Sequence, residues 1–106
     1  IGKVEEKLKI YVRNLANLKE ELARNNAEMN KELDQWENIN NFSLSNLCRS
    51  YYSNLALLIQ IRIEIATKYC ECFRDKYRQL KKTRDRIKKD AKKYSLDDLV
   101  LTVEAA

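Results

Sequence analysis

Turn-forming residues are almost missing from this sequence, and that constrains its fold more than any other feature. Among 106 residues there is one glycine, Gly2, and no proline. Tight turns and β-hairpins depend on these two residue types. Charged residues make up 35% of the chain and alternate with Leu, Ile and Tyr, a mixture typical of coiled coils and long bundles. The sequence therefore predicts an all-α protein of one domain at most, built from long amphipathic helices.

A heptad repeat opens the chain. Its apolar residues recur in alternating steps of three and four, the pattern of helices that pack side by side. The repeat weakens at Asn25 and Asn26 and then resumes. Its members are Ile1, Val4, Leu8, Tyr11, Leu15, Leu18, Leu22, Met29, Leu33 and Trp36. We expect a coiled-coil-like helical segment over residues 1–93 and a short helical segment over residues 94–106.

The segment 37–46 contains six Asn or Ser residues among ten, and these residues favour caps and turns. In one interpretation the chain turns here and forms a helical hairpin, with Asn41 or Ser43 capping the second helix. In the other, the helix runs straight through. We favour the continuous helix, because Gly and Pro are missing and because an apolar series continues beyond the segment. That series is Leu44, Leu47, Tyr51, Leu55 and Leu58.

Apolar residues crowd most of the circumference over residues 55–66. From Ile59 to Ala66 they alternate with polar residues in the period of a strand. No turn signal bounds the stretch and helical patterns flank it, so we predict a helix; a β-prone stretch that is poorly ordered alone is the alternative. A helix this apolar needs more than one neighbour, which makes it the expected centre of an oligomer interface or bundle core.

The expected interface is a single set of apolar positions along the helical repeat. We predict that these positions pack against a partner in a homo- or hetero-oligomer. They are Leu8, Leu15, Leu22, Trp36, Tyr51, Leu55, Leu58, Ile65 and Phe73.

The last residues carry the signs of a helix start. Ser95 followed by Asp98 resembles a capping box, with Asp in place of Glu. Tyr94 and Leu99 have the spacing of a hydrophobic staple. A short helix from residue 96 to about residue 104 is therefore expected.

Positive charge is concentrated in one segment. Residues 1–73 carry ten basic and ten acidic side chains, whereas residues 74–93 carry eleven basic against three acidic ones, a net charge of +8. Residues 94–106 carry three acids and no base. The candidate lipid- or anion-binding residues are Lys81, Lys82, Arg84, Arg86, Lys88, Lys89, Lys92 and Lys93.

Three kinds of partner fit this basic segment. Anionic phospholipid attracts Lys and Arg at about 1 kcal/mol each, nucleic acid attracts them in a salt-dependent way, and an acidic partner helix would do the same. The other interpretation is a solvated face of a coiled coil that binds no partner through these bases. We favour lipid over nucleic acid. Tyr69, Tyr77 and Tyr94 lie among the bases but fall on the apolar repeat, so packing explains them better than base stacking.

This chain lacks some of the residue types that catalytic sites use. The chain has no histidine for acid–base chemistry or zinc binding, and one glycine cannot build a phosphate-binding loop. We therefore expect no enzyme activity, no metal and no cofactor. Cys70 and Cys72 lie about 200° apart around a helix, so with Cys48 they are expected to be reduced thiols of a cytoplasmic protein. No apolar run reaches the roughly 18 residues of a membrane span.

One stretch resembles a known family. Landmarks eight residues apart, Trp36, Leu44, Tyr52 and Gln60, lie in an apolar repeat from Val4 to Phe73 that resembles the last long helix of sorting-nexin-type BAR domains. The resemblance implies a dimeric helical bundle that binds curved anionic membrane. The expected function is therefore a non-enzymatic, BAR-like dimerisation or scaffold module, peripheral on membranes. The alternative is a structural coiled-coil subunit of a larger complex that does not bind lipid.

Overall fold

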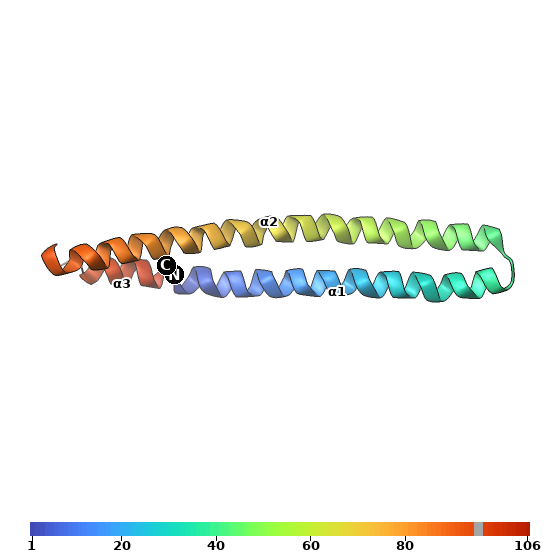
Figure 1. The fold of residues 1–106 in the computed structure, drawn as a ribbon, viewed down its shortest axis with the longest axis horizontal. Helices are drawn as coiled ribbons and strands as arrows, with labels where there is room; N and C mark the ends of the chain where they lie inside the picture. Colours follow the sequence, from blue (N-terminus) through green and yellow to red (C-terminus); the bar gives the residue numbers. More distant parts are fainter. Residues whose placement is uncertain (95–96) are drawn as a thin grey trace. The chain divides into compact units, whose positions relative to one another are not determined.

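The chain folds into three helices. The computed structural model describes residues 1–94 and 97–106, and their side chains except those of residues 91–94. Figure 1 shows α1 (Gly2–Asn38), α2 (Phe42–Tyr94) and α3 (Asp97–Ala105). No strand occurs among the described residues, so the all-α fold is confirmed, and residues 55–66 are helical despite their strand-like alternation.

The helices divide between two compact units. The hairpin unit, residues 14–66, holds the end of α1, the turn and the start of α2. The terminal unit, residues 1–13 and 67–106, holds the start of α1, the end of α2 and α3. The units cut across the expected segments 1–93 and 94–106, because the terminal unit combines the beginning of the chain with its last forty residues.

The preference for one continuous helix through residues 37–46 is wrong. α1 ends at Asn38 and α2 begins at Phe42, so the chain forms the helical hairpin of the other interpretation. Asn40 takes the left-handed conformation, with φ of 52°. Its N–H donates to the Glu37 carbonyl at 3.0 Å, and the Asn41 N–H donates to the Trp36 carbonyl at 2.9 Å. These two bonds form a Schellman motif, in which Asn takes the place that glycine usually holds.

Asn41 starts the second helix. Its side-chain Oδ1 accepts a hydrogen bond from the Leu44 N–H at 3.1 Å, and its carbonyl accepts from the Ser45 N–H at 3.0 Å. This is the geometry of an N-cap, which satisfies an amide that has no partner within the helix. Of the two caps proposed from the sequence, Asn41 is therefore the one used.

The hairpin unit is held by apolar contacts between the antiparallel arms of α1 and α2. Leu18 and Leu33 from α1 and Cys48 and Ile59 from α2 are buried. The Asn25 amide donates to the Tyr52 carbonyl at 3.0 Å, which ties the two helices together where the heptad repeat of α1 weakens. A polar residue thus fixes the alignment of the two arms.

The terminal unit has a small core of its own. Three side chains are buried there: Ile1, just before α1, Cys70 of α2 and Val100 of α3. The Tyr11 ring stacks on Tyr69 at 5.5 Å between centroids and lies 5.0 Å from the Phe73 ring. Aromatic pairs at these separations add stability beyond their buried area.

The short last helix is confirmed in outline. It begins at Asp97, and Asp97 and Asp98 in its first turn suit the positive end of the helix dipole. Three expected features lie outside the described residues. They are the Ser95 cap, the first residue of the predicted helix at position 96, and the Tyr94 side chain of the hydrophobic staple.

Candidate functional site

α2 carries two parallel apolar stripes within the hairpin unit. The inner stripe contacts α1 and consists of Ser45, Cys48, Tyr52, Leu55 and Ile59, all buried or half-buried. The outer stripe is exposed. It consists of Leu47, Tyr51, Leu58, Ile61 and Ile65, with exposed fractions of 65%, 60%, 59%, 44% and 52%.

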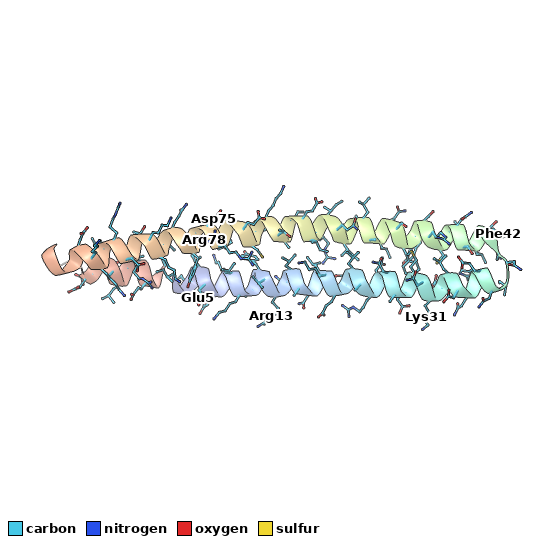
Figure 2. The ribbon with its side chains drawn as sticks, viewed as in Figure 1. Glu5, Arg13, Lys31, Phe42, Asp75 and Arg78 are labelled. Atoms are coloured by element: carbon cyan, nitrogen blue, oxygen red, sulfur yellow. The ribbon has the colours of Figure 1, made fainter. Side chains whose placement is uncertain are left out.

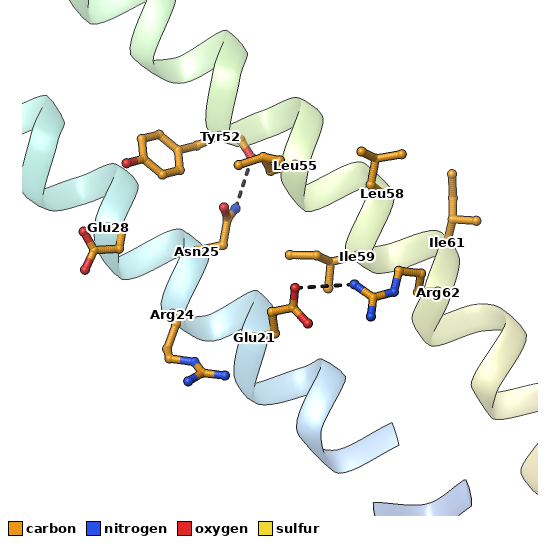
Figure 3. Close-up of a pocket in the computed structure, with 10 residues that line it drawn as sticks. All are labelled: Glu21, Arg24, Asn25, Glu28, Tyr52, Leu55, Leu58, Ile59, Ile61 and Arg62. Carbon is orange, nitrogen blue, oxygen red and sulfur yellow. Dashed lines mark hydrogen bonds and ion pairs between the residues drawn. The ribbon is translucent and has the colours of Figure 1, made fainter. Parts of the chain in front are cut away.

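Helix geometry explains why the two stripes separate. Leu47, Tyr51 and Leu58 each stand one position before a residue of the inner stripe, and successive residues on an α-helix lie about 100° apart. In Figure 3, Ile59 is directed toward α1, whereas Leu58 and Ile61 are directed away from it. The outer stripe is thus a second apolar face that the hairpin itself leaves uncovered.

The outer surface of α1 is different. Between residues 14 and 38, no large apolar side chain of α1 is exposed. Exposed positions there are polar, charged or alanine, and Lys31 lies on the side away from α2 (Figure 2). α1 is therefore an ordinary amphipathic helix with one partner, whereas α2 has apolar surface for two.

A groove of about 570 Å³ lies beside the outer stripe, between α1 and α2 (Figure 3). Leu58 and Ile61 belong to both the groove and the stripe. On the opposite wall, Glu21 forms an ion pair with Arg62 at 3.4 Å. The remaining lining residues are Arg24, Asn25, Glu28, Tyr52, Leu55 and Ile59. Groove and stripe together form one surface with an apolar centre and a charged margin.

A polar cluster lies on the inner side of α2. The Cys48 thiol donates to a Glu32 carboxylate oxygen at 3.4 Å. Burial raises the pKa of the Cys48 thiol, and the hydrogen bond to Glu32 adds to the shift. Burial, together with a hydrogen bond to the same carboxylate, raises the pKa of Tyr52 to about 12. The raised pKa values favour the protonated forms of both groups at neutral pH, and the protonated thiol donates from α2 to Glu32 of α1.

The candidate anion-binding residues lie in the terminal unit. Lys81, Lys82, Arg86, Lys88 and Lys89 are exposed and Arg84 is half-buried. The side chains of Lys92 and Lys93 lie outside the described residues.

Few of these bases have a close partner among the described residues. Lys88 pairs with Glu104 of α3 at 3.1 Å, and Arg84 pairs with its neighbour Asp85 at 3.3 Å. Lys81 lies over the Tyr77 ring, 4.7 Å from its centroid. Lys82 and Arg86 line a cavity of about 530 Å³ together with Gln79 and Thr83. This surface can attract anions, since most of its positive charge faces solvent.

The interface residues expected from the sequence fall into two groups that differ in burial. Leu8, Leu15, Leu22, Trp36, Leu55 and Phe73 are half-buried. Tyr51, Leu58 and Ile65 instead lie on the outer stripe.

Two members of the outer stripe, Leu47 and Ile61, are missing from the set of interface positions predicted above, although Ile61 lies within the apolar centre expected over residues 55–66. Their signal was present in the sequence as a second series of steps of three and four, offset by one position from the inner stripe.

Comparison with protein-family models, curated proteins and solved structures finds no match to this chain. None of the described helices contains a stretch long and apolar enough to cross a membrane. The BAR resemblance stays a prediction. The stretch that carries it is divided between α1 and α2, and its eight-residue series from Trp36 to Gln60 crosses the turn.

Proposed function

We propose that this chain is a non-enzymatic helical hairpin that works as an assembly module and binds another helix along the outer stripe of α2. The exposure of five large apolar side chains in one row carries this proposal. Single apolar residues on a surface are ordinary, but several of them aligned on one helix face mark an interaction site.

The arrangement suits a helical partner. When Asn54, between Tyr51 and Leu58, is counted, the outer stripe follows the steps of three and four that fit a second helix packed nearly parallel to α2. The groove beside it gives partner side chains an apolar floor with Glu21 and Arg62 at the margin. Burying the stripe would remove apolar surface from water, which is the main driving force of association.

Sedimentation equilibrium of the chain over a range of concentrations tests this proposal. We expect concentration-dependent association that Leu58→Asp or Ile65→Asp abolishes, because a carboxylate in an apolar interface must be desolvated. Ser53→Asp is the matched control, since Ser53 is exposed on α2 but lies away from the stripe. A chain that stays monomeric, or that associates equally well with Asp at position 58, would contradict the proposal.

A second candidate function is binding of an anionic membrane surface by the basic segment of α2. Its support is the set of exposed bases from Lys81 to Lys89, which face solvent with few acidic partners. Each base near such a surface contributes about 1 kcal/mol. Such a module would be peripheral on the membrane, as the BAR resemblance also implies.

Flotation of the chain with phosphatidylserine vesicles tests the second candidate. We expect binding that weakens as salt rises and that is lost when five bases are changed to Glu. Those five are Lys81, Lys82, Arg86, Lys88 and Lys89.

A control with the same net charge reverses five exposed bases on α1 that lie outside the groove. These are Lys3, Lys9, Arg13, Lys19 and Lys31. If both variants lose binding equally, net charge rather than the basic segment is responsible, and the second candidate fails.

A further inference from the structure

Resting on the proposed assembly function, we infer that the occupant of the outer stripe is a second copy of this chain, with the two α2 helices parallel and in register. The stripe from Leu47 to Ile65 covers 19 residues, whose 18 steps of 1.5 Å make about 27 Å of helix. A second copy offers a stripe of the same length and chemistry.

The exposed area fits a two-fold interface. Full burial of a Leu or Ile side chain removes roughly 120 Å² from water, and that of a Tyr roughly 200 Å². At the observed exposures, the five side chains of the stripe present roughly 400 Å² per copy. Two copies present roughly 800 Å², and the groove residues that a neighbouring helix also covers raise the total toward the roughly 1,000 Å² at the lower limit of a specific interface.

Asn54 decides the orientation of the two copies. It is exposed and lies at the centre of the outer stripe, three residues after Tyr51 and four before Leu58. An amide carries both donors and acceptors, so two Asn54 side chains that face each other satisfy one another. The two Asn54 side chains face each other when the helices are parallel and in register. An antiparallel pair centred on the stripe sets Asn54 against Leu58 and leaves the amide without a partner.

The hairpin leaves room for such a pair. The inner stripe, which contacts α1, lies about 100° around α2 from the outer stripe. A two-fold axis parallel to α2 would therefore place the α1 helices of the two copies on opposite sides of the α2 pair. Each copy keeps its own α1 contacts while the outer stripes meet.

Disulfide trapping in the full chain tests the orientation. In a background with the exposed Cys72 changed to Ser, Leu47→Cys and Ile65→Cys are each oxidised with oxidised glutathione, separately and mixed. In the parallel pair each variant forms a disulfide between like positions of the two copies, 47 with 47 or 65 with 65. The mixture then yields no disulfide between positions 47 and 65. In an antiparallel pair the equivalent residues stand about 27 Å apart. Links would then form between 47 and 65 and not between like positions.

Two further variants complete the experiment. Ser53→Cys, exposed but off the stripe, is expected to link at least tenfold more slowly than Leu47→Cys. Asn54→Leu is expected to tighten association and to allow both linkage patterns, because it removes the group that selects the parallel pair. Links only between 47 and 65, or equal linking by Ser53→Cys, would overturn the inference while the proposed association survives. A chain that sediments as a monomer would overturn both.

Discussion

The inner and outer stripes of α2 both follow the helical repeat and both carry Leu, Ile and Tyr, yet α1 covers only one of them. Cys48 and Ile59 on the inner stripe are buried, whereas Leu47 and Leu58, one position earlier, are mostly exposed. The inner stripe stabilises the hairpin. The outer stripe is exposed and contributes little to the folding of a single chain, and we propose that it serves association. Two series of residues that look alike in the sequence therefore differ in burial.

The sharpest test of this contrast is truncation of neighbouring residues, one on each stripe. Ile59→Ala should lower the free energy of unfolding by about 2–4 kcal/mol, because it leaves a cavity between α1 and α2. Leu58→Ala should lower it by less than about 1 kcal/mol in dilute, monomeric samples. Urea denaturation followed by circular dichroism measures both. Equal losses would mean that the stripes do not differ, and the comparison would fail.

The second test uses pH, because the raised pKa of Cys48 belongs to the inner stripe alone. An acid whose pKa rises on folding stabilises the fold fully below its unfolded pKa, about 8.5 for Cys. That stability is lost as pH rises through the folded pKa. Tyr52, with a pKa of about 12, extends the loss above pH 10 or so. The melting temperature should therefore fall from about pH 8.5 upward.

Matched variants isolate the contribution of Cys48. Cys48→Ala should flatten the fall in melting temperature between about pH 8.5 and 10, whatever it costs in packing at neutral pH. Cys72→Ala, which removes an exposed thiol, should leave the slope unchanged. A slope that responds equally to both substitutions would show that the environment of the inner stripe does not control the titration.

The smallest expected effect concerns the hydroxyl of Ser45 on the inner stripe. It is buried and has no hydrogen-bond partner among the described residues. An unsatisfied buried hydroxyl costs free energy, so Ser45→Ala should stabilise the hairpin by up to about 1 kcal/mol. Ser53→Ala on the exposed side of α2 should change stability by no more than about 0.5 kcal/mol. Thermal melts of the two variants decide the point, and a destabilised Ser45→Ala would contradict the assignment.

The turn at residues 39–41 departs from the continuous helix that the sequence predicts. The missing Gly and Pro favoured a continuous helix, but Asn40 tolerates the left-handed conformation and closes the Schellman motif without glycine. Asn41 then caps α2. The Asn-rich composition of residues 37–46 was the correct signal, and the lack of glycine was a misleading one, since Asn is the other residue that enters this conformation at low cost.

The candidate surfaces were partly predictable. The basic segment follows directly from composition, because charged side chains on a long helix end are exposed unless something covers them. The interface residues were predicted as one series that mixed Leu55 with Tyr51, Leu58 and Ile65. Separating them required knowledge of which side of α2 faces α1.

The sequence by itself determined the helices, the basic segment and the excess of apolar residues on α2, because each depends on local spacing and composition. Only the tertiary structure decided which apolar stripe became the core of the hairpin. Both stripes have helical periodicity, and nothing local distinguishes Leu58 from Ile59. The turn at residues 39–41 and the bond from Asn25 to the Tyr52 carbonyl align α1 with one stripe. That alignment covers Ile59 and leaves Leu58 exposed.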